Sequence, residues 1–529
     1  MTKKQLTIIT VLTVTAITLG LLISRQVWMR FDLTANRVYT ISPVSRALHT
    51  EIEDTVHITY YLSDRLLSIH PMPGQVIDFL RVYASYSRGR IRVNIVDPAR
   101  AGIANIVQQM GIQPHQLEDQ ESVSLVYAGI VIEYLDGMEV LPVVFSLDTL
   151  EYDLTSRIRS LITGRGREVG IIVGDMDRQW ATDYQALQHF FHNSGYTSRV
   201  IIPGMSIPDT LPALFILGGA EDLDDWTLYL IDRYIQNGGN VLFAVETIRV
   251  NVQSPAENRV ITDQGLLSMI SYYGATIQPS LVLDRASIPM SIPVPTTFGT
   301  TMRQRVTYPF WITILERNVN RNNMLTANFN GLDLFWASPI EMNPPENIEY
   351  EVLFSSTEEA WLMTRDFSTD PRASAFMFER EVPDTVGQRI LGVTLSGVFP
   401  SYFEGVDKPV REWSDEVLPD MPTTPRPARI IVIGNTEFAV NSWGITGNPR
   451  SLGFLRAVAD WLGQDPDIVA ISTRQGHQQL DRIADADVRR RAVLFSQGLN
   501  VVIIPLGVIV AGVIVSLKRK AKTKAGKVS

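Results

Sequence analysis

The sequence predicts an α/β protein with a transmembrane helix at each end of a folded body. Short apolar runs rich in Val, Ile and Leu alternate with stretches of helical periodicity, a pattern typical of sheets covered by helices. Residues 6–23 and 499–517 are uncharged apolar segments, each close to the roughly 20 residues that cross a bilayer core. At 529 residues, the chain is long enough for several domains.

Basic residues lie at the outer end of both apolar segments. Lys3 and Lys4 precede the first, and the basic residues of 518–529 follow the second. Because cytoplasmic flanks of membrane spans are rich in Lys and Arg, we expect both termini in the cytoplasm, with 518–529 as a basic tail, and the body outside it. A cleaved signal peptide is the alternative for the first segment, but no small-x-small cleavage site follows Ile23. A buried core helix is the alternative for 499–517.

Residues 31–146 predict a small α/β domain. Ser42 followed by Pro43 combines an N-cap residue with Pro at the first helical position, so a helix over 43–48 is expected. The later periodicity gives a β-α-β-α-β-β order of thioredoxin-like arrangement, without a CxxC motif. The expected strands are 55–62, 91–96, 123–134 and 139–145, and the expected helices are 75–86 and 101–110.

Residues 165–475 predict a larger α/β domain with a parallel sheet. It follows a helix over 147–161 and the turn Gly164–Glu168. Residues 285–427 are rich in Pro and are predicted to be inserted loops, with a strand at 388–395, and residues 476–498 are predicted to be a polar connector. The expected strands are 169–173, 198–202, 213–217, 240–245, 280–283, 428–434 and 467–472, and the expected helices are 181–193, 225–236, 263–273 and 452–462.

Composition and motifs argue against several classes of function. The net charge is −9, and residues 25–517 hold 39 basic against 56 acidic residues, which does not favour nucleic-acid binding. The absence of Cys excludes disulfides, thiolate catalysis and Cys-ligated zinc. His189 and His192 share one helix face as half a metal site would, but the favoured interpretation is that they flank two core-facing Phe residues. No GxxxxGK[ST], GxGxxG or GxSxG motif is present, so we predict no enzyme, cofactor, metal or catalytic residue.

Two predicted strands end in Gly and acidic residues. Gly174-Asp175 and Gly218-Gly219 lie at the carboxyl ends of strands, where open α/β sheets bind ligands. Tight turns with acidic helix starts are the alternative and favoured interpretation. A carbohydrate- or peptide-binding or hydrolytic module that uses an acidic crevice near Asp175 is therefore the alternative function. The crevice candidates are Asp175, Asp177, Gly218, Gly219, Glu221 and Asp222.

The segment after the first apolar run resembles the start of the GldG family. Members of that family are auxiliary membrane proteins of ABC transporters, and the matching residues here are Asp32, Leu33, Thr34, Tyr39, Thr40, Ile41 and Ser42. Weaker family motifs follow in the same order, at 96–98, 238–242, 433–438 with Asn448, and 461–462. Ile41 stands where the family usually has Leu, and residues 450–453 lack a second family Asn.

The resemblance implies a GIFT-type domain, related in fold to glutamine amidotransferases but without their catalytic Cys. It also implies partnership with a permease and a separate cytoplasmic ATPase. The predicted function is therefore that of a non-enzymatic extracytoplasmic auxiliary subunit, anchored in a bacterial inner membrane, which docks on the permease and handles substrate. Asp32, Leu33, Thr34, Tyr39, Thr40 and Ser42 are the docking candidates. The resemblance does not imply gliding motility.

Overall fold

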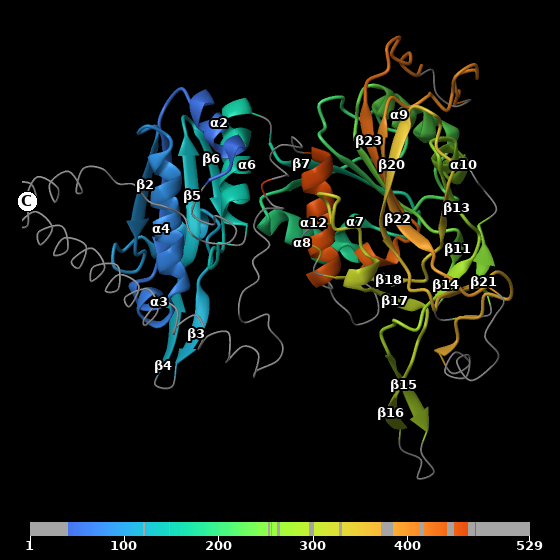
Figure 1. Ribbon diagram of the computed structural model, residues 1–529, viewed down its shortest axis with the longest axis horizontal. Helices are drawn as coiled ribbons and strands as arrows, with labels where there is room; N and C mark the ends of the chain where they lie inside the picture. The colour runs from blue at the N-terminus through green and yellow to red at the C-terminus, as the bar shows by residue number, and fades with distance from the viewer. Residues whose placement is uncertain are drawn as a thin grey trace, which may run out of the picture. The chain divides into compact units, whose positions relative to one another are not determined.

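The computed structural model describes residues 41–463 and residue 471, apart from short internal segments. The chain divides into two compact units, Met1–Gln475 and Gly476–Ser529, and every described residue belongs to the first. That unit contains a four-stranded and a seven-stranded sheet (Figure 1). The internal segments that are not described are 120–121, 148, 165, 252–253, 255–256, 262–264, 296–300, 327–328, 330, 372–384, 412–416, 442–448 and 464–470.

The predicted transmembrane architecture is corrected by the structure. Within the described ranges, no helix is long and apolar enough to cross a membrane. The structure therefore does not bear out the expected fold of a body held between two spans, nor the inner-membrane location that was expected from it. The segments assigned to the membrane, 6–23 and 499–517, lie outside the described residues, as do 476–498 and 518–529. The mixed α/β character of the body is confirmed.

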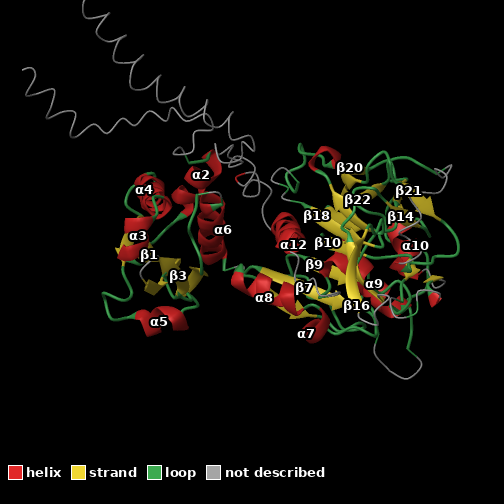
Figure 2. Ribbon diagram, turned by 90° about the horizontal axis from the view of Figure 1, so that it is seen from below, coloured by secondary structure: helices red, strands yellow, loops and turns green. Residues whose placement is uncertain are grey.

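The four-stranded sheet lies in the N-terminal part of the described chain. Its elements are α2 (Pro43–Glu51), β1 (Val56–Leu62), α3 (Asp64–Ile69), α4 (Met72–Ser85), β2 (Ile91–Val96), α5 (Ala104–Gln109), β3 (His115–Asp119), β4 (Ser122–Val126), β5 (Ala128–Tyr134), β6 (Gly137–Leu141) and α6 (Leu150–Thr163). The strand order is β2-β1-β5-β6, with β1 parallel to β2 and antiparallel to β5. Alternate residues of β1 are buried, and they pack with α2, α4 and α6 on one face, while α5 covers the other (Figure 2).

Ser42 fixes the start of α2 and connects it to α6. Its hydroxyl accepts a hydrogen bond from the Ser45 backbone N–H at 3.0 Å, as an N-cap residue should. The Ser42 backbone N–H donates to the Glu151 carboxylate at 2.5 Å, and the Ser45 hydroxyl donates to the same oxygen at 2.6 Å. The only docking candidate among the described residues is therefore buried in a structural contact. The other five lie outside the described residues.

The seven-stranded sheet forms the centre of the larger part. Its strands and covering helices are β7 (Glu168–Val173), α7 (Trp180–Asp183), α8 (Gln185–Asn193), β8 (Thr197–Val200), β9 (Leu214–Leu217), α9 (Asp225–Gln236), β10 (Val241–Ala244), α10 (Gly265–Tyr272), β20 (Ile348–Ser355), β22 (Ile390–Gly397), β23 (Ala428–Ile433) and α12 (Pro449–Gly463). The order is β20-β22-β23-β10-β9-β7-β8, and the five strands from β23 to β8 are parallel. Alternate strand residues pack against α8 and α12 on one face and against α9 and α10 on the other (Figure 2).

The Pro-rich region, 285–427, forms several strands where loops were predicted, in addition to β22, which corresponds to the strand predicted at 388–395. Its aromatic and β-branched runs form short pairs whose side chains enter the core, including Trp311 and Phe335. The pair β15–β16 extends from the body in Figure 1. Within this region, β15 (Met290–Pro295) pairs with β16 (Thr301–Val306), and β17 (Trp311–Ile314) pairs with β18 (Leu332–Phe335). Two more of its strands, β19 (Ile340–Met342) and β21 (Trp361–Met363), pair with β13 (Ala275–Ile277) and β14 (Leu281–Leu283), which precede it. A further pair before the region is β11 (Ile248–Arg249) with β12 (Arg259–Val260).

Candidate functional site

The parallel sheet has a topological switch point between β7 and β9. The chain leaves β7 for β8 on one side and then returns to β9 on the other side of β7. Loops diverge at such a point, which is where open α/β sheets bind ligands. Gly174-Asp175 follows β7 and Gly218-Gly219 follows β9. The structure brings them into contact, because the Gly219 N–H donates to the Asp175 carboxylate at 2.9 Å and the Gly174 N–H donates to the Leu217 carbonyl at 2.9 Å.

Glycine is required where these two loops meet. Gly218 and Gly219 have φ values of 74° and 90°, in the left-handed region that favours glycine. A Cβ at Gly174 would lie 2.5 Å from the Gly219 Cα, and one at Gly218 would lie 2.3 Å from an Asp175 carboxylate oxygen. The backbones approach as closely as they do only because side chains are absent.

Replacing Gly174 with Ala is expected to lower the free energy of unfolding by about 2 kcal/mol or more, because the new methyl group meets backbone that cannot move away. Gly453→Ala on α12 is the matched control, since its Cβ meets nothing within 4 Å and Ala favours a helix. Chemical unfolding of both variants checks the prediction. Equal stabilities for the two variants would contradict it.

Asp175 lies at the centre of the cluster, and the residue is buried at 3% exposure. Its Oδ1 accepts from Gly219 and from Arg249 Nη2, the latter at 3.3 Å. Its Oδ2 has no hydrogen-bond partner, although Arg178 Nε lies 3.9 Å away. A buried acceptor without a donor costs free energy, and such atoms are frequent at functional positions.

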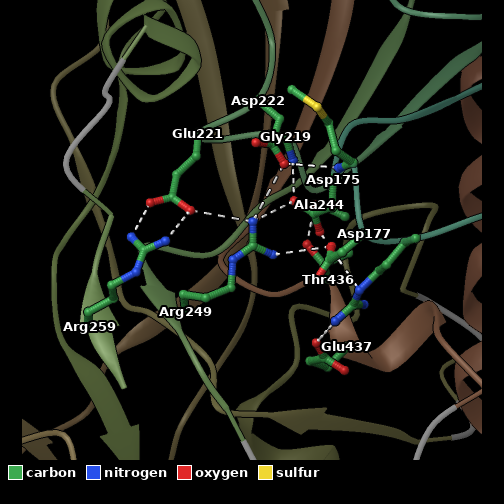
Figure 3. A network of polar contacts seen from close by, with 12 residues as sticks. Asp175, Asp177, Gly219, Glu221, Asp222, Ala244, Arg249, Arg259, Thr436 and Glu437 are labelled. Atoms are coloured by element: carbon green, nitrogen blue, oxygen red, sulfur yellow. Dashed lines mark hydrogen bonds and ion pairs between the residues drawn. The ribbon is translucent and has the colours of Figure 1, made fainter. Parts of the chain in front are cut away.

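Two arginines from one short strand pair reach this cluster (Figure 3). Arg249 on β11 lies within 3.3–4.0 Å of Asp175, Asp177, Glu221 and Asp222. Arg259 on β12 donates to both Glu221 oxygens, one of them at 3.0 Å. The pKa of Glu221 is lowered, chiefly by this hydrogen bonding with Arg259. Asp177 is the most exposed of the four acids, at 73% of its side chain, and lies at the edge of the cluster.

Further members follow β10 and β23 and are not among the predicted crevice residues. Glu246 comes after β10 and is buried at 7% exposure, and its Oε2 has no hydrogen-bond partner. Burial, and next the charge of Asp175, raise the pKa of Glu246 to about 8. Glu437 comes after β23 and pairs with Arg178. The rule that selected Asp175, an acidic residue after a buried parallel strand, would have found both.

The predicted histidine positions take no part in this cluster. His189 and His192 are exposed on α8, while Phe191 between them is buried in the core. This agrees with the interpretation that they flank a core-facing side chain. Among the residues that the structure describes, no three His, Asp or Glu side chains are grouped so as to hold a metal ion.

A hollow of about 750 Å³ lies away from the switch point and is lined by residues 278–280, which follow β13, and by residues of β19, β21 and β22. Two of its lining residues, Glu341 and Arg389, are charged. Glu341 accepts a hydrogen bond from Gln278 at 2.9 Å, and Arg389 Nη2 donates to the Thr385 carbonyl at 2.7 Å. The charge cluster at the switch point is the stronger candidate site, because two of its carboxyl oxygens are buried without a hydrogen-bond partner at the position where this sheet type binds ligands.

Comparison with known proteins gives matches to both parts of the described chain. A family model described as an ABC-type uncharacterized transport system matches residues 166–470, which is more than half of the chain. A model of a domain of unknown function matches residues 35–133. An uncharacterized protein of Borreliella burgdorferi is 25% identical over 511 residues, which cover 93% of this chain and 94% of that protein.

Proposed function

We propose that this chain, which belongs to the ABC-type uncharacterized transport system family, acts as a non-catalytic auxiliary subunit of an ABC transport system. The observation that carries the proposal is the family match over residues 166–470. That range includes all seven strands of the larger sheet and the charge cluster at its switch point. The family points to an auxiliary role in transport rather than to catalysis.

We propose a permease and a separate ATPase as partners. The chain has no GxxxxGK[ST] sequence, so ATP hydrolysis by that type of site must come from another subunit. The GldG-like motif supports the narrower proposal that this subunit docks on the permease through the part of the motif between Asp32 and Thr40, since Ser42 is buried as the cap of α2. We also propose a division into a small domain, 31–146, and a GIFT-type domain, 165–475.

One observation favours a substrate-handling role within the transport system. Asp175 and Glu246 each keep a buried carboxyl oxygen without a hydrogen-bond partner at the position where this sheet type binds ligands. Of the remaining crevice candidates, Gly218 and Gly219 bring the two loops together, and Glu221 and Asp177 contact Arg249. A hydrolytic role would require Asp175 to act on a bound substrate, and Asp175→Asn would then abolish an activity.

Co-purification tests the proposed function. The tagged full-length chain, isolated in mild detergent from its native cells after crosslinking, should bring down a permease and an ATPase. Mass spectrometry should find both at amounts comparable with the bait and absent from an untagged strain. Recovery of the chain as a single species under crosslinking would contradict the proposal.

A further inference from the structure

We propose that the carboxyl cluster at the switch point binds the cationic group, a guanidinium or primary ammonium, of a small organic ligand. In this proposal, the guanidinium of Arg249 occupies the binding site of the ligand's cationic group until the ligand displaces it. The inference deepens the proposed function by naming a ligand class, and it rests on that function for its biological meaning. Binding itself is measured on the chain alone.

The first argument is the charge balance of the cluster. Six carboxyl groups and three guanidinium groups meet in the network of ion pairs and close contacts at the strand ends. Even with Glu246 protonated, the five other carboxylates outnumber the three cations. An added cation is attracted there, and an anion is repelled. The carboxyl groups belong to Asp175, Asp177, Glu221, Asp222, Glu246 and Glu437, and the guanidinium groups to Arg178, Arg249 and Arg259.

The second argument is independent of the number of acids. Asp175 Oδ2 and Glu246 Oε2 are enclosed, since the two residues are only 3% and 7% exposed, yet neither oxygen has a hydrogen-bond partner. A guanidinium or ammonium group carries several N–H donors in a compact arrangement and can satisfy such oxygens. A neutral or anionic ligand group offers fewer donors or none.

The third argument is the way in which Arg249 is held. Its guanidinium contacts four carboxylates, but it extends from a two-residue strand that pairs only with β12 in the described structure, outside the central sheet. Its side chain is 21% exposed. A partly exposed arginine on a short strand pair can be exchanged for an equivalent group from solution more easily than a fully buried one.

The chemistry of the cluster favours an organic cation over a metal ion. In the described part of the chain, no three acidic or histidine side chains are grouped to ligate a metal. The neighbouring Arg178 and Arg259 would also repel a compact divalent ion, whereas a planar guanidinium can lie beside them and share carboxylates. We therefore expect the ligand to present its charge on nitrogen.

Agmatine, which has a guanidinium at one end and a primary amine at the other, is a suitable probe. We expect the Arg249→Ala variant of the full-length chain to bind agmatine at least about tenfold more tightly than the native chain, because the internal competitor is gone. Calorimetry at constant ionic strength measures both affinities. Agmatine should also raise the melting temperature of Arg249→Ala more than that of the native chain.

Three controls make the result specific. Arg321→Ala removes an arginine that pairs with Glu316 at 3.0 Å on the surface, and it should leave agmatine affinity unchanged. Adding Asp175→Asn to Arg249→Ala should remove the gain in affinity. Arg249→Gln, which keeps most of the length of the side chain, should bind as Arg249→Ala does and replaces it if the alanine variant does not fold.

Several outcomes would overturn the inference. Equal agmatine affinity of Arg249→Ala and the native chain would do so. Binding of the dianion succinate to Arg249→Ala with the same affinity as agmatine would do so too. Binding of the tripeptide Gly-Arg-Gly without binding of agmatine would assign the cation to a partner polypeptide instead. If co-purification recovers the partners but agmatine does not bind, only this inference is contradicted. If agmatine binds but no partners are recovered, only the proposed function is contradicted.

Discussion

Replacing Asp460 with Asn is expected to lower the free energy of unfolding by about 3–5 kcal/mol, because it leaves a buried charge without its counter-ion. Asp460 on α12 lies 2.5 Å from Arg167 Nη2 and accepts a hydrogen bond from the Tyr196 hydroxyl. The Arg167 side chain is fully buried, and its Nε and Nη1 have no hydrogen-bond partner. Its guanidinium also lies over the Tyr196 ring, 4.3 Å from the centroid.

Asp420→Asn is the matched control for that experiment. Asp420 also forms an ion pair at 2.5 Å, with Lys408, but 92% of its side chain is exposed. Solvent screens a pair of this kind, so we expect the control variant to unfold nearly as the native chain does. Denaturant unfolding, followed by Trp fluorescence, measures both. If the two variants lose the same stability, burial does not decide the contribution of the Asp460 pair.

Glu246→Gln is expected to remove a pH dependence of stability. Burial first, and then the charge of Asp175, raise the pKa of Glu246 from 4.5 to about 8 in the folded chain. Between these pH values the folded chain holds a proton that the unfolded chain has lost. Unfolding therefore releases a proton, and stability falls as the pH rises from about 4.5 to about 8.

The neutral amide that Glu246→Gln introduces cannot lose a proton, so the variant should lack this slope. We expect it to match the native chain near pH 5 and to be more stable by roughly 3 kcal/mol above pH 8. Glu359→Gln, at an exposed position, should keep the native slope. Parallel pH profiles for the native chain and Glu246→Gln would show that Glu246 does not titrate in this way.

Local patterns predicted several elements accurately. The expected helix 225–236 coincides with α9, whose N-cap Asp224 accepts from the Thr227 N–H at 2.9 Å. The expected strand 91–96 coincides with β2. Both are set by nearest neighbours along the chain: an apolar period and a capping side chain. Where the local signal was ambiguous, 123–134 divided into β4 and β5, and 181–193 divided into α7 and α8.

The Pro-rich region was predicted poorly for a physical reason. Proline marks turns, so its frequency here favoured a loop prediction even where strands of six and eight residues form, as at Met290–Pro295 and Ile348–Ser355. Several strands of the region form because partners distant in the sequence supply the other half of each ladder, as when Ala275–Ile277 pairs with Ile340–Met342. Such pairing and burial are tertiary effects, which a periodicity argument does not contain.

The α/β character, most strands of the central sheet and the acidic residues after β7 and β9 follow from local sequence patterns alone. Which charges meet depends on the tertiary structure. Strand order places Glu246 and Glu437, from β10 and β23, beside Asp175, and the β11–β12 pair brings Arg249 and Arg259 to the same point. The reason is that ionic contacts and desolvation depend on separation in space. Arg178 and Glu437, which are 259 residues apart in the chain, are brought into contact only by the packed sheet.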